Sequence, residues 1–154
     1  MKTLFLTFLT VLSLSLAGVV RAAQAPSLDV AADSSFQAAL EEISEHFTET
    51  TGCAVALRCG ASAELADGLL AGGTADVFFP ADAESLDRLR EKGIVDVALA
   101  RNVVVLERPG EDPAYLRAVV LANAPNRLRA MAYLDYLTSE PARAAFAGHG
   151  FALP

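Results

Sequence analysis

Helix-like and strand-like patterns of apolar residues alternate along the chain from residue 27 onward. Residues 35–50 repeat apolar side chains at helical spacing, with glutamates on the opposite face, and Gly52 follows as a helix end. The short apolar runs at 27–32 and 53–58 have the length of buried strands. Such alternation is typical of a mostly parallel sheet with helices on both faces. It predicts a three-layer α/β/α domain.

The second half of the chain continues the alternation. Two β-rich runs, at 95–107 and 115–122, are separated by the turn-forming residues 108–113, which favours a hairpin-like pair. A break in the first run is expected near Arg101 and Asn102. The other predicted elements are a strand at 75–79 and helices at 62–71, 83–92, 125–137 and from Pro141. The positions expected to face the core from the helix at 125–137 are Leu128, Met131, Leu134 and Leu137.

The first 22 residues have the organisation of a secretory signal peptide. Lys2 precedes an apolar stretch, and Ala22 places a small residue at the cleavage position, with Val20 two residues before it. An uncleaved anchor is the alternative, but the stretch is shorter than the ~20 residues of a typical span. A cut after Ala25 is disfavoured because Pro26 would follow it. We therefore divide the chain into a signal peptide, 1–22, and one domain, 23–154, in the periplasm or otherwise exported.

Charge excludes some partners. The signal peptide holds two of the 12 basic residues and none of the 19 acidic ones, so the remaining chain has a net charge of −9. Nucleic acids and anionic membrane surfaces need a basic footprint, which this chain lacks. A small anion stays compatible with this composition, provided that neutral dipoles bind it.

Neither the cysteines nor the histidines form a recognisable site. Cys53 and Cys59 flank a predicted strand that spans about 20 Å, whereas a disulfide needs Cα atoms ~4.4–6.8 Å apart. We therefore expect no bridge between them. His46 and His149 have no neighbouring metal-ligand pattern, so no metal and no cofactor are expected.

Two serines stand at consecutive strand-to-helix junctions. Ser34 has the place of an N-cap, with Gln37 at capping-box spacing, and Ser62 has the same place at the next helix. Each junction directs backbone N–H groups and a hydroxyl toward the carboxyl edge of the sheet, which is an arrangement that binds anions. Serine is also an ordinary helix cap, so a structural role is the alternative. Asp76 and Asp82 flank the strand at 75–79 and are interpreted as capping or solvated groups, since no catalytic constellation is present.

Several segments together resemble the periplasmic molybdate- and tungstate-binding proteins of ABC transporters. The resemblance implies the type 2 periplasmic binding protein fold, and it covers nearly all of residues 23–154. The similar segments are Ala31-Ala32-Asp33-Ser34, Gly60-Ala61-Ser62-Ala63-Glu64-Leu65-Ala66, Ala75-Asp76-Val77-Phe78-Phe79-Pro80-Ala81-Asp82, Leu99-Ala100-Arg101-Asn102, Tyr136-Leu137-Thr138-Ser139-Glu140-Pro141 and Gly150-Phe151-Ala152-Leu153-Pro154.

The chain departs from this family in having one lobe. Residues 103–106, where the family would cross to a second lobe, lead through a short turn to 115–121, where it would return. The resemblance therefore implies ligand roles for Ser34 and Ser62 only. Carboxylates at Asp33 and Glu64 lie beside both serines and would repel an oxyanion.

Two hypotheses about function follow, and neither is enzymatic. The first is weak binding of a tetrahedral oxyanion such as molybdate or tungstate, completed by a second copy or by a partner such as a transporter permease. The second is a protein-interaction or dimerisation module that has lost ligand binding.

The exported protein should begin at Ala23. Its intact mass should lack residues 1–22, because cleavage follows Ala22. An Ala22→Arg variant, which removes the small residue at the cut, should keep the longer chain. Recovery of the unaltered sequence in the membrane fraction with residues 1–22 attached would favour the anchor.

Overall fold

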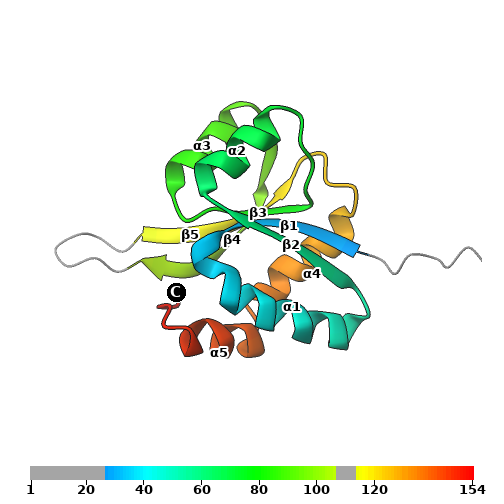
Figure 1. Cartoon of the computed structure of the whole chain (residues 1–154), viewed down its shortest axis with the longest axis vertical. Helices are drawn as coiled ribbons and strands as arrows, with labels where there is room; N and C mark the ends of the chain where they lie inside the picture. The colour runs from blue at the N-terminus through cyan, green and yellow to red at the C-terminus, as the bar shows by residue number, and fades with distance from the viewer. Residues whose placement is uncertain (1–26, 107–113) are drawn as a thin grey trace, which may run out of the picture.

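A five-stranded sheet forms the centre of the computed structural model, which describes residues 27–106 and 114–154 (Figure 1). The sheet consists of β1 (Ser27–Asp33), β2 (Ala54–Gly60), β3 (Val77–Phe79), β4 (Val95–Leu106) and β5 (Ala114–Leu121). Their order is β2-β1-β3-β5-β4. β1 pairs in parallel with β2 and β3, whereas β5 is antiparallel to β3 and β4. Four strands therefore share one direction, which confirms the mostly parallel sheet and the β4–β5 hairpin.

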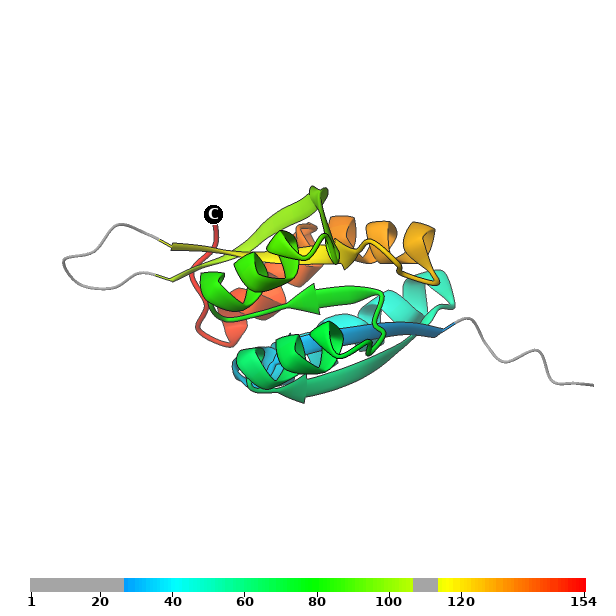
Figure 2. The same ribbon diagram turned by 90° about the horizontal axis from the view of Figure 1, so that it is seen from above.

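Helices cover both faces of the sheet. One face carries α1 (Gln37–Thr51), α4 (Arg127–Leu137) and α5 (Glu140–Gly148), and the other carries α2 (Ser62–Leu70) and α3 (Ala83–Glu91). Figure 2 views the sheet from the side of α2 and α3. The three-layer α/β/α prediction is confirmed.

Alternating side chains of β1 supply both halves of the core. Leu28, Val30 and Ala32 face the cluster beneath α1, α4 and α5, whereas Ala31 faces the cluster beneath α2 and α3. In the larger cluster the rings of Phe36 and Phe79 stack, with centroids 4.3 Å apart. Phe36 lies in the short 3-10 helix Ser34–Phe36, so this stack fixes the connection from β1 to α1 against the end of β3.

β2 lies at one edge of the sheet and separates the two cysteines. Cys53 immediately precedes the strand and is buried, while Cys59 lies near its other end and is half-buried. Both are free thiols. The predicted strand between them is confirmed.

One predicted core position is wrong. Leu128 is 82% exposed, whereas α4 buries Ala130, Tyr133, Leu134 and Leu137. At 3.6 residues per turn, a position two residues before Ala130 is rotated by about 200° and faces away from the sheet. The spacing of the leucines alone did not identify the buried face of α4, because that face also includes the small Ala130 and the polar-tipped Tyr133.

Two predicted segments, the signal peptide at 1–22 and the turn at 108–113, lie outside the described residues. Within residues 27–106 and 114–154, no helix combines the length and the apolarity needed to cross a membrane.

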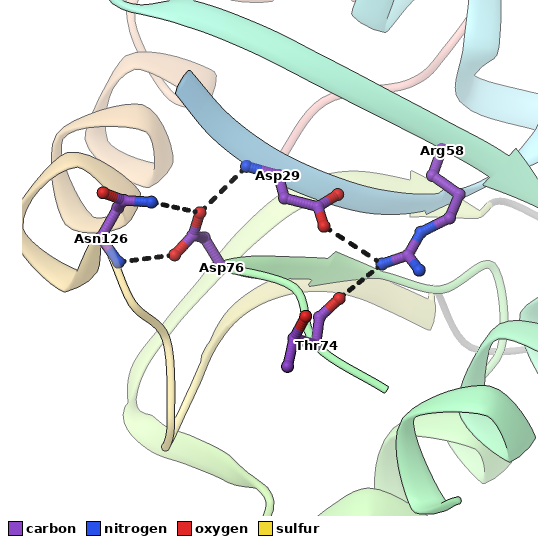
Figure 3. A network of polar contacts seen from close by, with 5 residues as sticks. All are labelled: Asp29, Arg58, Thr74, Asp76 and Asn126. Carbon is purple, nitrogen blue, oxygen red and sulfur yellow. Dashed lines mark hydrogen bonds and ion pairs between the residues drawn. The ribbon is translucent and has the colours of Figure 1, made fainter. Parts of the chain in front are cut away.

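A buried carboxylate joins the strands at the amino edge of the sheet (Figure 3). Asp76 is 1% exposed, and it accepts hydrogen bonds from the backbone N–H of Asp29, at 2.9 Å, and of Asn126, at 2.7 Å. The side-chain amide of Asn126 donates a third, at 3.1 Å. Nearby, Arg58 donates to the carbonyl of Thr74. Asp76 therefore ties β1 to the start of α4, and its interpretation as a solvated group is wrong.

Removing this carboxylate should destabilise the fold. Asp76→Ala leaves buried N–H groups unpaired, so we expect the free energy of unfolding to fall by about 2–4 kcal/mol. Asp82→Ala is the matched control, because Asp82 flanks the same strand but only caps α3, and its loss should cost about 1 kcal/mol. Urea denaturation measures both, and equal losses would contradict the role given to Asp76.

Candidate functional site

Two strand-to-helix junctions meet at the carboxyl edge of the sheet. Asp33 ends β1 and pairs in register with Gly60, which ends β2. The 3-10 helix follows the first strand, and α2 follows the second. Since the strands are parallel neighbours, their helix N-termini point to the same region, which is where open α/β sheets bind ligands.

The Asp33 carboxylate bridges the two junctions. Its Oδ1 accepts from the backbone N–H of Ser35 at 3.0 Å and from the Ser35 hydroxyl at 2.8 Å. Its Oδ2 accepts from the backbone N–H of Ser62 at 3.0 Å and from the Ser62 hydroxyl at 2.6 Å. Four donors therefore converge on one carboxylate, and these are the kinds of donor that an oxyanion would use.

Ser62 extends this network to a third strand. The residue is 4% exposed, and its Oγ accepts from the backbone N–H of Ala81 at 2.9 Å while donating to Asp33. Ala81 follows β3, so one hydroxyl connects the ends of β1, β2 and β3. The hydroxyl hydrogen of Ser62 is thus already used inside the fold.

Ser34 does not have its predicted capping role. The N-cap of the 3-10 helix is Asp33, and the Gln37 side chain donates to Glu41 rather than reaching back to Ser34. Likewise the N-cap of α2 is Ala61, and Ser62 is its first helical residue. Ser34 is exposed beside the carboxylate. Aspartate caps helices as well as serine does, so the helical segment begins one residue earlier than predicted. Ser35, rather than Ser34, therefore supplies the N–H and hydroxyl donors.

Hydrogen bonding keeps the Asp33 carboxylate ionised. Partial burial raises the pKa of this group, but the hydrogen bonds from Ser62 and Ser35 more than offset burial, so the pKa lies below its usual value. Glu64, the second acid expected to oppose an anion, lies exposed in the first turn of α2. The two acids therefore differ. Asp33 accepts the hydrogen bonds of Ser35 and Ser62, whereas Glu64 only adds a negative charge nearby.

The remaining candidate residues make no hydrogen bond to Asp33 or Ser62. Asp82 caps α3 by accepting from the backbone N–H of Ser85, as predicted. His149 contacts Glu42 at 2.9 Å, and His46 is exposed. Among residues 27–106 and 114–154, no three His, Cys, Asp or Glu side chains are grouped so as to hold a metal ion.

The family profile of bacterial extracellular solute-binding proteins matches residues 28–115 and 103–152. The chain belongs to this family. The two matched segments overlap at 103–115, which is the end of β4 and the start of β5, where the sequence resemblance places the crossing to a second lobe. Within residues 27–106 and 114–154, the chain forms a single lobe around one five-stranded sheet.

Solved structures show the same fold. A substrate-binding domain from Clostridium difficile, assigned to a molybdenum ABC transporter, superposes with a TM-score of 0.77 at 12% identity, over 83% of this chain and 99% of that one. The periplasmic molybdate-binding protein of Azotobacter vinelandii superposes with a TM-score of 0.74 at 14% identity, over 82% of this chain and 99% of that one. Iron-bound HitA from Pseudomonas aeruginosa superposes with a TM-score of 0.69 at 11% identity, over 83% of this chain and 85% of that one. No curated protein sequence matches the chain. Relatives this distant establish the solute-binding fold, and their ligands differ.

The stabilising effect of Asp33 should depend on pH. Asp33→Ala should lower the free energy of unfolding by about 1 kcal/mol at neutral pH, the usual cost of a lost N-cap. Because folding lowers the pKa of Asp33, this stabilisation is complete above the unfolded value of about 3.9 and is lost as pH falls through the folded value. Urea denaturation across pH should therefore show the two proteins converging below about pH 4. Glu64→Ala should remain close to wild type throughout, and a constant Asp33 effect would contradict the network.

Proposed function

We propose that this chain is an exported, single-lobed solute-binding protein that binds a tetrahedral oxyanion only weakly by itself. The observation that carries this proposal is the Asp33 carboxylate, which accepts four hydrogen bonds at the carboxyl edge. The proposed oxyanion ligands are Ser62 and the turn formed by Ser34 and Ser35. The role is binding rather than catalysis, in keeping with the family.

The resident carboxylate opposes an incoming anion. Two unit charges about 4 Å apart near a protein surface repel by about 4 kcal/mol, which weakens binding by about three decades. The low pKa of Asp33 keeps this charge in place at neutral pH. Molybdate or tungstate must therefore displace the Asp33 side chain before it gains the same donors.

One lobe also leaves part of the anion in water. In the two-lobed proteins that the sequence resembles, the ligand is enclosed between the lobes, so a single lobe would supply only part of its hydrogen bonds. Each charge-assisted hydrogen bond contributes about 1–3 kcal/mol. Tight binding would thus need a second copy of the chain or a partner such as a transporter permease.

Replacing Asp33 should uncover the anion site. We expect the secreted protein to bind molybdate or tungstate at millimolar concentration or more weakly, and Asp33→Ala to bind at least tenfold more tightly, because the donors are released and the repulsion ends. Isothermal titration calorimetry measures both. Glu64→Ala is the matched control, since it removes an equal charge that holds none of these donors, and its effect should be much smaller.

Serine variants in the Asp33→Ala background identify the ligands. Ser62→Ala and Ser35→Ala should each weaken the recovered binding about tenfold or more, and Ser34→Ala shows whether the exposed hydroxyl also takes part. Absence of heat in every variant, with folding confirmed by circular dichroism, would exclude an oxyanion site.

A second candidate is an interaction module that has lost ligand binding. The engaged Ser62 hydroxyl favours it, because a side chain that donates to Asp33 and accepts from Ala81 has a sufficient structural role. Failure of Asp33→Ala to bind any oxyanion would leave this second function.

A further inference from the structure

A separate hollow opens at the carboxyl edge on the face covered by α3. Its volume is about 330 Å³, and it lies between α3 and the β4–β5 hairpin, beyond the end of β3. Apolar side chains of Leu86, Ala100 and Val119 line it. The Asp33 network involves none of these residues, so the hollow is distinct from the proposed anion site.

An exposed tyrosine borders this hollow. Tyr115, near the start of β5, is 51% exposed and belongs to the lining of the hollow. Large aromatic side chains of this kind dominate protein interfaces when they enter a pocket on a partner. The same face thus presents both an exposed aromatic side chain and a hollow of about 330 Å³.

The charges around the hollow are balanced, unlike those of the whole chain. Asp82 and Asp87 line it together with Arg90 and Arg117, whereas the full sequence has a net charge of −7. Asp87 and Arg90 form only a loose, exposed pair at 3.4 Å. Two copies of this chain would repel each other through most acidic faces, but here acids of one copy can meet arginines of the other.

We propose that this face is the interface of a homodimer. In a two-fold dimer the same patch lies on both sides, so it must be complementary to itself. The hollow and Tyr115 supply complementary shape, and the two acids and two arginines supply complementary charge. The patch includes Tyr115, which lies within residues 103–115, where the two matched family segments overlap.

Sedimentation velocity of the secreted protein, from low micromolar to submillimolar concentration and without any oxyanion, tests the dimer. We expect reversible dimerisation that weakens as salt rises, because opposite charges meet across the interface. Tyr115→Ala should raise the dissociation constant at least tenfold. Ala100→Phe, which fills the hollow, should also weaken the dimer.

Leu128→Ala is the matched control. Leu128 is the other large hydrophobic side chain that is exposed among the described residues. It is the second residue of α4 and does not line this hollow. Its variant should dimerise like the wild type. At a concentration where the wild type is monomeric, the Tyr115→Ala and Leu128→Ala variants should both keep the wild-type melting temperature. A protein that stays monomeric at every concentration, or a dimer that Tyr115→Ala and Leu128→Ala affect equally, would overturn the proposal. Because no anion is present, this result is independent of oxyanion binding.

Discussion

The carboxyl edge of this lobe depends on the Asp33 carboxylate, which joins the N-termini of two helical segments. Asp33 accepts hydrogen bonds from Ser35, in the 3-10 helix, and from Ser62, the first residue of α2. The Ser62 hydroxyl in turn accepts from the backbone N–H of Ala81, which follows β3. Helix N-termini concentrate unpaired N–H groups and partial positive charge, which require an anion or an acceptor. Here the chain provides that acceptor itself. These four donors are therefore paired within the chain itself.

The amino edge is fixed in a comparable way by a different carboxylate. Asp76 accepts from β1 and from the residue before α4, and it is fully enclosed. Asp76 precedes β3, and the half-buried Asp33 ends the neighbouring strand β1. The central strands therefore cannot shift in register without breaking charged hydrogen bonds. The apolar layers supply the bulk of the folding free energy, while these carboxylates define which residues lie opposite one another.

Most of the architecture was predictable from the sequence because hydrophobic periodicity directly reports burial. The alternation of strands and helices, the end of α1 at Gly52 and the hairpin of β4 with β5 all follow from it. The face of α4 was predicted less well, since alanine and tyrosine carry weaker signals than leucine. For Asp33 the pattern showed only an acid beside a serine. Whether that acid repels a ligand or replaces it depends on side-chain directions, which periodicity does not contain.

The antiparallel pairing of β5 between β3 and β4 has a consequence for how such lobes are gained and lost. The chain leaves the sheet along β4 and comes back along β5, its immediate neighbour. Any length of polypeptide inserted between these strands starts and finishes at adjacent points, so its removal changes no strand order and breaks no pairing elsewhere. An entire lobe inserted between β4 and β5 could therefore be lost while all five strands of this sheet keep their order and pairing.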